Sequence, residues 1–569
     1  MDPRSFYQPG VPREITLPTD SLVEVYETAV AEGSNQTALD FFGRTTSYAE
    51  LGDQIARAAE GLRRLGVRPR DRVALVLPNC PQHVVAFYAI LRLGAIVVEH
   101  NPLYTPRELR HIFENHSARV VIAWDVAVEK LRSQPGDIRL DHIISVNLLD
   151  EFPRMKRLAL KLPLPGLRST RRKLTKKVRQ TIPWKSLLKN RGLKTSHPRP
   201  KASDIAAIQY TSGTTGLPKG AILSHLNLYA NARQGEAWMP DIKRGSETFY
   251  AILPFFHGFG MTMYLIYSML KLARMHVFPT FDLSMVMGAV KKHPPTVLCA
   301  VPPIFEAIAA SAKRRRISLR SVRLAMSGAM SLPVAVTEVW EKATGGQLIE
   351  GYGMTESSPV ALGNPFYPTR RPGTLGLPFP STEVRVVDAE DSSIDLAPGE
   401  RGELLIRGPQ VFQGYWNNPD ETAATLLPGG WLASGDIVTQ DEDGFVTIVD
   451  RKKELVVTSG FNVSPTEVEI VLKSHPAVEE AAVVGLPHPH AGEQVVAAII
   501  PADGQAVAVE ELRSFCRDRL AAYKVPRQIV SVEALPNSLL GKVLRGELRS
   551  QLLAQGLTTE PKPTSRRRS

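Results

Sequence analysis

The stretch 210-YTSGTTGLPKG-220 gathers hydroxyl side chains and glycines around a single lysine, Lys219. Its glycines let backbone N–H groups approach phosphate oxygens closely, its hydroxyls donate hydrogen bonds and its lysine supplies positive charge. In a P-loop the lysine follows a glycine and precedes a hydroxyl residue, whereas here Pro218 precedes Lys219 and Gly220 follows it. The stretch therefore predicts a phosphate-binding loop of another class, although a run of this composition, taken alone, is usually a flexible loop.

Strand and helix patterns alternate on both sides of this loop. Residues 46–125 alternate amphipathic helical patterns with short apolar runs, which is typical of βα units and a largely parallel sheet. The alternation returns around the loop, with a strand predicted at 205–210 and a helix at 223–238. Further strand–loop pairs are predicted at 296–303, 323–328 and 348–353. The pattern indicates an α/β fold.

The pattern changes towards the C-terminus. From about Thr382, short β-runs separated by turns predict a small sheet or barrel. After Asp450 a separate pattern of strands and helices begins. Its first predicted helix has Ser464 as N-cap, proline at the first helical position and glutamate three residues after the cap. We predict a large N-terminal domain of βα-layered sheets with a small β-barrel-like part (1–449). A small, mobile α+β C-terminal domain (450–569) follows, with a disordered tail (558–569).

The net charge of +12 belongs to one segment of the chain. Residues 153–201 hold 17 Lys or Arg and no Asp or Glu, so the rest of the chain is slightly acidic. No zinc-finger or RNP motif accompanies these charges, and no nucleic acid is expected as a partner. The interleaved leucines fit a basic amphipathic surface for anionic lipid, and a solvated insertion loop is the alternative.

One apolar run, from Tyr250 to Leu270, is long enough to span a bilayer. Because Pro254, His257 and nearby glycines interrupt it and no second span accompanies it, we predict a buried strand, loop and helix instead. No basic region followed by an apolar run opens the chain, so no signal peptide is expected. These features indicate a cytoplasmic protein, with the inner face of the membrane as an alternative location.

Two motifs after the loop offer groups suited to a nucleotide. The first is 350-EGYGMTE-356, in which Tyr352 can stack on a base, while Thr355 and Glu356 provide oxygen ligands for a hard cation. The second is 431-WLASGDIVTQDEDGF-445, in which Asp436 can accept hydrogen bonds from ribose hydroxyls. Each motif by itself is equally well a surface turn.

Two more motifs lie near the C-terminus. The segment 450-DRKKELVVTSGFNVSPTEVE-469 contains Arg451, which has the right charge for a nucleotide, and Gly460, which permits close approach of backbone to ligand. The segment 535-LPNSLLGKVLR-545 places Lys542 directly after a glycine. Each is weak by itself, but five such motifs in this order are not a coincidence.

Together the five motifs resemble those of the acyl-adenylate-forming superfamily, which includes acyl-CoA synthetases, adenylation domains of peptide synthetases, and luciferases. The likeness covers nearly the whole chain, and the basic insertion and 253-LPFFHGFGMT-262 are most similar to bacterial long-chain fatty-acid–CoA ligases. This resemblance implies that ATP and a fatty acid form acyl-AMP and pyrophosphate, after which coenzyme A takes the acyl group. The implied cofactors are ATP, Mg²⁺ and coenzyme A.

The resemblance also implies the site residues. Lys542, Glu356 and His257 are the catalytic candidates, the last in the wall of the acyl pocket, and Thr211 and Glu356 are the candidates for holding Mg²⁺. Nucleotide and coenzyme contacts are implied for Thr211, Ser212, Gly213, Thr214, Thr215, Gly216, Lys219, Ser327, Gly328, Ala329, Gly351, Tyr352, Gly353, Met354, Thr355, Asp436, Arg451 and Gly460.

In this family the C-terminal domain rotates between the two steps. Here the implied hinge is Asp450. The rotation removes Lys542 from the active site and brings in the segment that carries Gly460. Family members often have Pro-Arg-Thr-x-x-Gly-Lys, whereas this chain has Pro536-Asn537-Ser538 before the retained Gly541-Lys542. The departure puts only details of the loop contacts in doubt.

Several alternatives stay open. A fatty-acyl-AMP ligase that loads a carrier protein, a CoA ligase for another apolar or aryl acid, and a luciferase-like oxygenase share the nucleotide motifs. A non-catalytic lipid- or nucleic-acid-binding relative would have lost motif charges, and Lys219, Glu356, Asp436, Arg451 and Lys542 are all present. A homodimer is a further hypothesis.

Overall fold

The computed structural model describes residues 3–211, 218–458, 461–488, 492–502, 508–520, 522–538, 541–555 and 557. The chain divides into two compact units. The first holds the described residues up to Val384 together with Ile406–Ala433, and the second holds Arg385–Leu405 and the described residues from Ser434 onwards. The boundary between residues 449 and 450 and the movement of a C-terminal domain stay predictions, and the tail 558–569 lies outside the described residues.

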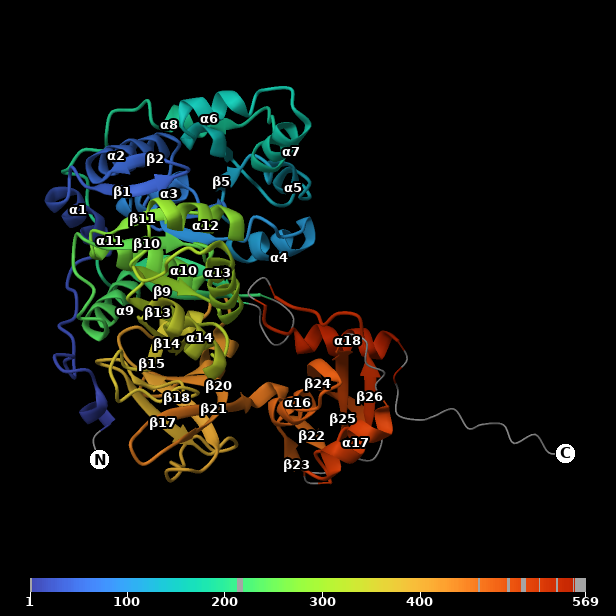
Figure 1. The fold of residues 1–569 in the computed structure, drawn as a ribbon. Coiled ribbons are helices and arrows are strands. Elements are labelled where there is room, and N and C mark those ends of the chain that lie inside the picture. Colours follow the sequence, from blue (N-terminus) through green and yellow to red (C-terminus); the bar gives the residue numbers. More distant parts are fainter. Residues whose placement is uncertain are drawn as a thin grey trace. The chain divides into compact units, whose positions relative to one another are not determined.

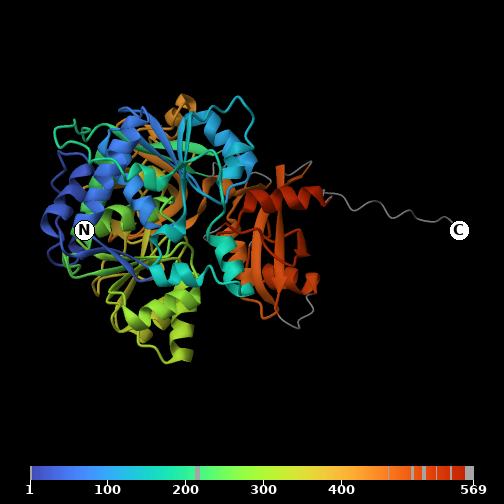
Figure 2. The same ribbon diagram turned by 90° about the horizontal axis from the view of Figure 1, so that it is seen from above.

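Two large sheets organise the first unit, with helices packed on their faces (Figures 1 and 2). The nine-stranded sheet has the order β16-β15-β14-β13-β12-β10-β11-β1-β2. Its strands are β1 (Thr37–Phe41), β2 (Arg44–Ser47), β10 (Thr248–Ala251), β11 (Arg274–Val277), β12 (Val297–Ala300), β13 (Leu324–Ser327), β14 (Gln347–Gly353), β15 (Val360–Gly363) and β16 (Leu377–Pro378). The inner strands are parallel, whereas β2, β15 and β16 pair in antiparallel fashion.

The seven-stranded sheet has the order β7-β6-β5-β3-β4-β8-β9. Its strands are β3 (Arg72–Val76), β4 (Ile96–Glu99), β5 (Val120–Trp124), β6 (His142–Val146), β7 (Ile182–Pro183), β8 (Ile205–Thr211) and β9 (Lys219–Ser224). All neighbours are parallel except β8 and β9. Strands β8, β12, β13 and β14 lie where strands were predicted at 205–210, 296–303, 323–328 and 348–353, and β3 and β5 lie within the alternating pattern of 46–125. The predicted α/β class is confirmed.

The helix predicted at 223–238 is confirmed, but a strand that was not predicted lies between the phosphate loop and this helix. Strand β9 comes first and pairs antiparallel to β8, with Thr211 opposite Lys219. The helix α9 (His225–Trp238) follows, capped by Ser224, whose Oγ accepts from the backbone N–H of Asn227 at 3.1 Å. The loop therefore joins two paired strands.

Several helices of the first unit begin at a side chain that caps them. Thr105, for example, forms a capping box with Glu108 before α4. The helices are α1 (Val23–Glu32), α2 (Tyr48–Arg64), α3 (Pro81–Arg92), α4 (Pro106–His116), α5 (Val128–Arg132), α6 (Arg154–Ala159), α7 (Pro165–Leu174), α8 (Trp184–Leu187), α9, α10 (Gly258–Gly260), α11 (Ser268–Leu270), α12 (Leu283–Lys292), α13 (Pro302–Arg315), α14 (Val334–Thr344) and α15 (Pro419–Thr425). Short turns are η1 (Pro3–Phe6), η2 (Leu148–Glu151), η4 (Thr355–Ser357) and the π-helix η3 (Met261–Tyr267).

The run from Tyr250 to Leu270 lies in the core of this unit. Strand β10, a loop, and then α10, η3 and α11 follow one another, and almost all of their side chains are buried. The predicted buried strand, loop and helix is confirmed. Among the residues that the structure describes, we find no helix with the length and apolarity needed to cross a membrane.

A third sheet has the order β17-β18-β20-β19, with β21 paired to β20. Its strands are β17 (Glu383–Val387), β18 (Gly402–Arg407), β19 (Leu426–Leu427), β20 (Trp431–Gln440) and β21 (Val446–Arg451). The β-runs at 383–387, 402–407 and 446–451 follow the predicted pattern, whereas β20 was not predicted as a strand.

The C-terminal α+β part has its own sheet, with the order β23-β22-β25-β24 and β26 on β25. Its elements are η5 (Lys452–Glu454), β22 (Val456–Thr458), β23 (Phe461–Val463), α16 (Pro465–Lys473), β24 (Val478–His488), β25 (Gly492–Pro501), α17 (Val509–Arg517), β26 (Gln528–Ser531) and α18 (Arg545–Ala554). Helices α16 and α17 bury Leu472 and Leu512 against the sheet. As predicted, Ser464 caps α16, because its Oγ accepts from the Glu467 N–H at 3.1 Å.

A buried histidine pair lies beside the strand that leads into the phosphate loop. The Ala118 N–H donates to Nδ1 of His116, so the proton of neutral His116 is on Nε2, which lies 3.0 Å from Nε2 of His100. His100 in turn donates from Nδ1 to the Val98 carbonyl at 2.9 Å. Burial lowers the pKa of His100 to about 4 and that of His116 well below its usual range. Both rings are therefore neutral in the folded protein at neutral pH.

We expect this pair to make the protein labile to acid. The unfolded chain binds protons on both histidines near pH 6.5, whereas in the folded protein the pKa of His100 is about 4 and that of His116 is well below its usual range. Stability therefore falls as the pH drops through this window, by up to about 1.4 kcal/mol per pH unit for each histidine. Denaturant unfolding of wild type and His100→Gln between pH 7 and pH 5 measures this slope. An equally steep slope in the variant would contradict the assignment to His100.

Candidate active site

Three parallel strands of the nine-stranded sheet end at the same edge. Ala300, Ser327 and Glu350 are opposite one another in β12, β13 and β14. The predicted turn Ser327-Gly328-Ala329 therefore lies beside Gly351 and Tyr352. Such carboxyl-end edges form the usual binding crevices of open α/β sheets.

Two glycines at this edge are required by their surroundings. A Cβ on Gly328 would lie 3.0 Å from the Phe259 ring and 3.3 Å from the Gly351 carbonyl oxygen. A Cβ on Gly353 would lie 1.8 Å from the carbonyl oxygen of Pro359. Met354 follows, and Thr355 and Glu356 begin η4. The sheet edge is therefore tightly packed and rigid.

A cluster of charged and polar side chains forms around Tyr415. The Tyr415 hydroxyl donates to the Glu356 carboxylate at 2.6 Å, and Glu356 is only 5% exposed. The ammonium of Lys219 lies 5.6 Å from the centre of the Tyr415 ring and forms an ion pair with Glu421 of α15. Burial, and then the nearby Glu356 charge, raise the pKa of Tyr415, so its phenol stays protonated and can donate.

The backbone around Tyr415 fixes this cluster to the phosphate loop. The Phe412 N–H donates to the Glu356 carbonyl at 2.8 Å, and the Trp416 N–H donates to the Gly220 carbonyl at 2.7 Å. Between them the segment 412–416 also exchanges hydrogen bonds with Ile222 of β9. Lys219, at the start of β9, and Glu356, in η4, are thereby held on two sides of one tyrosine.

The donor set fits a hard divalent cation that is shared with phosphates. Glu356 supplies a buried carboxylate, and Thr211, which ends β8 opposite Lys219, supplies a hydroxyl. Mg²⁺ is usually bound by one or two protein oxygens together with substrate phosphates. Within the described ranges no three His, Cys, Asp or Glu side chains gather into a metal cluster.

His257 lies in the loop between β10 and α10. Gln209 of β8 donates to the Phe256 carbonyl at 3.2 Å, so this loop packs against the strand that ends at Thr211. His257 is partly exposed, and burial by the surrounding protein lowers its pKa to about 4. The imidazole is therefore neutral at physiological pH.

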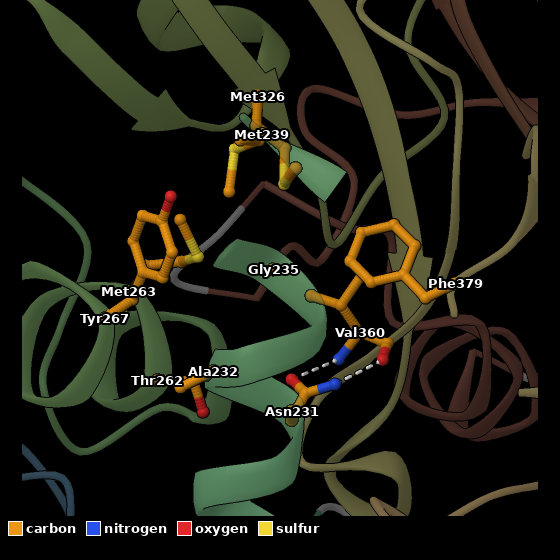
Figure 3. A pocket seen from close by; sticks show the side chains of 10 residues that line it. All are labelled: Asn231, Ala232, Gly235, Met239, Thr262, Met263, Tyr267, Met326, Val360 and Phe379. Atoms are coloured by element: carbon orange, nitrogen blue, oxygen red, sulfur yellow. Dashed lines mark hydrogen bonds between the residues drawn. The ribbon is translucent and has the colours of Figure 1, made fainter. Parts of the chain in front are cut away.

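A narrow apolar pocket lies between α9 and η3 (Figure 3). Side chains from α9, η3, β13 and β15 face one another around it. Asn231 fixes the wall by donating to the Val360 carbonyl at 2.6 Å and accepting from the Val360 N–H at 3.3 Å. The lining residues are Asn231, Ala232, Gly235, Met239, Thr262, Met263, Tyr267, Met326, Val360 and Phe379.

The second unit holds the remaining described candidates. Asp436 of β20 is 3% exposed and is directly opposite Arg451 of β21 in the antiparallel register. Asp450, the predicted hinge, is buried and accepts hydrogen bonds from Ser464 Oγ at 2.5 Å and from the Thr466 N–H at 3.0 Å. The two candidate ribose contacts are therefore adjacent on one pair of strands.

Lys542 follows a tight turn in the second unit. The Ser538 N–H donates to the Lys542 carbonyl at 2.7 Å, and the Lys542 N–H donates to Ser538 Oγ at 3.1 Å. Gly541 has φ 81°, a left-handed conformation that favours glycine. Ser212, Gly213, Thr214, Thr215, Gly216 and Gly460 lie outside the described residues.

Sequence reasoning missed Tyr415 and Glu421. They lie in the stretch 415-YWNNPDE-421, about which no prediction was made. Glu421 is 202 positions from Lys219 in the chain. The aromatic residues and the proline of this stretch could have marked it as a structured segment beside a predicted sheet. They do not indicate that it contacts the phosphate loop.

Comparison with known proteins defines the class. Residues 26–416 match the family model of the AMP-binding enzyme, and residues 467–542 match that of the AMP-binding enzyme C-terminal domain. The chain belongs to the AMP-binding enzyme family, as the motif resemblance had predicted.

Particular relatives are similar along almost the whole chain. The long-chain-fatty-acid–CoA ligase of Bacillus subtilis is 37% identical over 544 residues, covering 95% of this chain and 96% of the relative. The long-chain-fatty-acid–CoA ligase of Salmonella typhimurium is 37% identical over 553 residues, covering 96% and 97%. The crystal structure of ATP-bound MatB from Rhodopseudomonas palustris matches with a TM-score of 0.80 and 27% identity, covering 93% of this chain and 99% of that one.

We expect Lys219→Met to raise the KM for ATP. Loss of one charge-assisted contact with phosphate weakens binding by about 10- to 100-fold. Lys271→Met is the matched control, because Lys271 is also buried and ion-paired, to Glu236 at 3.4 Å, at a different place in the same unit. Initial rates over a range of ATP concentrations measure the effect. An equal change of KM in both variants would indicate a general loss of packing.

Proposed function

We propose that this protein is a long-chain fatty-acid–CoA ligase. A fatty-acid carboxylate oxygen attacks the α-phosphorus of ATP, the bond to the β-phosphate breaks, and acyl-AMP and pyrophosphate form. The thiol of coenzyme A then attacks the acyl carbonyl, loses its proton, and acyl-CoA and AMP leave. The Lys219–Tyr415–Glu356 cluster beside the phosphate loop carries the proposal, because it supports binding of a polyphosphate and its metal together.

In the first step the protein has to bring an anionic carboxylate to a highly anionic nucleotide. Lys219 would hold the β- and γ-phosphates once its ion pair with Glu421 opens, and Lys542 would contact the carboxylate and the α-phosphate. Thr211 and Glu356 would hold Mg²⁺, which neutralises phosphate charge when it is bound. Positive charge fixed in advance where negative charge develops is the main source of such catalysis.

The nucleoside half would lie along the carboxyl edge of the nine-stranded sheet. Tyr352 offers its ring to adenine beside the Ser327-Gly328-Ala329 turn. Asp436 and Arg451, opposite one another on β20 and β21, would bind the ribose region. The tight packing at Gly328 supports a contact surface of fixed shape.

The acyl chain would enter the pocket of Figure 3. Met239, Met263 and Met326 line it, and methionine is flexible enough to move aside as an apolar ligand enters. His257 is not among the residues that line this pocket, so its place in the acyl-pocket wall stays a prediction. An apolar lining with few polar groups suits a fatty acid.

We expect Gly460→Leu to spare acyl-AMP formation and to lower acyl-CoA formation by about 10- to 100-fold, because a side chain would obstruct the approach of the pantetheine thiol. Each half-reaction is measured separately, the second with supplied acyl-AMP. Equal loss of both half-reactions would indicate misfolding instead of a role in the thioester step.

Pyrophosphate release over a panel of acids, with and without coenzyme A, tests the function. The panel contains fatty acids of increasing length and an aryl acid. The proposal expects the highest kcat/KM with a long-chain acid and turnover that depends on coenzyme A. Turnover that depends instead on an acyl carrier protein would favour the fatty-acyl-AMP ligase.

Three further hypotheses belong with this function. Mg²⁺ is the proposed metal, a homodimer is the proposed assembly, and the cytoplasm or the inner face of the membrane is the proposed location.

A further inference from the structure

Helix α6 presents apolar side chains to solvent. Met155 and Leu158, one turn apart, are 78% and 56% exposed. Leu162 and Leu164, just beyond the helix, are 50% and 55% exposed, whereas Leu160, which directly follows α6, is buried. Four large apolar side chains within ten residues are thus exposed to solvent, and such a concentration of exposed apolar surface usually marks an interaction site.

The segment that carries these exposed apolar side chains is also rich in cations, without balancing acids. Helix α6 contains basic residues, and helix α7 contains a further basic run. No Asp or Glu occurs anywhere in residues 153–201. Within the part of the chain that the structure describes, seven of these cations form no ion pair: Arg154, Arg157, Lys161, Arg168, Arg171, Arg172 and Lys173. Their charge is therefore available to an anionic partner.

The α6–α7 surface (residues 154–174) is anchored to the first unit. Lys156 Nζ donates to the Phe42 carbonyl at 2.7 Å, and the Trp124 indole N–H donates to the Leu174 carbonyl at 2.9 Å. Just after α7, Thr175 Oγ1 donates to the carboxylate of Asp125 at 2.5 Å. Strand β7 then continues the seven-stranded sheet at its edge next to β6. These fixed contacts argue against a merely solvated insertion.

We propose that the α6–α7 surface docks on an anionic lipid bilayer. Met155, Leu158 and Leu162 enter the boundary between headgroups and acyl chains, while the cations of α7 meet lipid phosphates. A nucleic acid would use the same cations but would leave the apolar side chains without a partner. The combination of exposed apolar side chains and unpaired cations is typical of helices that lie in a membrane interface.

Sedimentation with vesicles tests the proposal. Full-length protein is mixed with vesicles of phosphatidylglycerol and phosphatidylcholine, or of phosphatidylcholine alone, at low and high salt. We expect binding to the anionic vesicles that weakens as salt rises, because salt screens exposed charges. Equal binding to both kinds of vesicle, or to neither, would overturn the proposal.

Two variants separate the contributions of the surface. Neutralising Arg171, Arg172 and Lys173 to Gln should weaken binding by at least about tenfold, since each cation near such a surface strengthens it about fivefold. Replacing Met155, Leu158 and Leu162 with Ser should also weaken it at least about tenfold. These side chains are largely exposed, so the melting temperature should not change.

Matched controls lie elsewhere on the first unit. Lys313, Arg314 and Arg315, changed to Gln at the end of α13, remove the same number of exposed charges. Val339→Ser on α14 removes an apolar side chain that is 56% exposed. A loss of binding in these controls as large as in the α6–α7 variants would contradict the assignment. So would competition by duplex DNA that persists after the serine substitutions, because it would favour nucleic acid.

Discussion

Lys542→Ala is expected to lower the rate of acyl-AMP formation by a factor on the order of 10²–10³ or more, because it removes a preorganised positive contact with the transition state. The backbone of Lys542 is fixed by two hydrogen bonds to Ser538 and follows the left-handed turn at Gly541. Thioester formation from supplied acyl-AMP should be nearly spared, because the lysine has by then rotated away in the proposed mechanism.

The two half-reactions have to be measured separately in this variant. Lys473→Ala is the matched control, because Lys473 lies in the same unit and makes only an exposed ion pair with Glu480 at 3.4 Å. The control should change neither step. Unchanged adenylation in Lys542→Ala, with the protein folded, would overturn both the role of the lysine and the rotation of the C-terminal domain.

Glu356→Gln is expected to reduce adenylation by a factor on the order of 10²–10³, because it removes the charge proposed to hold the metal. The amide oxygen of glutamine can still accept from the Tyr415 hydroxyl, which lies 2.6 Å from the carboxylate in the wild type. Folding should therefore be spared, and a higher Mg²⁺ concentration should be needed for half-maximal activity.

Tyr415→Phe separates the hydrogen bond from the charge. It keeps the Glu356 carboxylate but leaves it without the phenol donor, so a loss of only about tenfold is expected. Rates over a Mg²⁺ titration distinguish the two variants. If Glu356→Gln shows a normal rate and a normal Mg²⁺ dependence, the metal is held elsewhere.

Much of the fold could be predicted because local patterns agreed with burial. The strands ending at Ala300 and Ser327 are short apolar runs followed by glycine or proline. Strand β9 was missed because Pro218, Lys219 and Gly220 look like a loop, and only pairing with β8 makes Lys219–Ser224 a strand. Pairing between strands is a tertiary effect that outweighs local propensity.

The site was predicted in its parts but not in its contacts. Glu356 and Lys219 could be selected from motifs, whereas the tyrosine between them could not, since the contact joins segments far apart in the chain. Asp436, predicted as a ribose contact, lies buried in β20, a strand that the sequence pattern did not predict. Distant contacts of this kind are set by the packing of the sheets.

Analysis of all reaction products tests the central claim most directly. The purified protein is incubated with a long-chain fatty acid, ATP and Mg²⁺, first without and then with coenzyme A. We predict acyl-AMP and pyrophosphate in equal amounts without coenzyme A, and acyl-CoA with an equal amount of AMP once it is added. Formation of ADP and phosphate, or acyl-AMP that coenzyme A does not consume, would contradict the account.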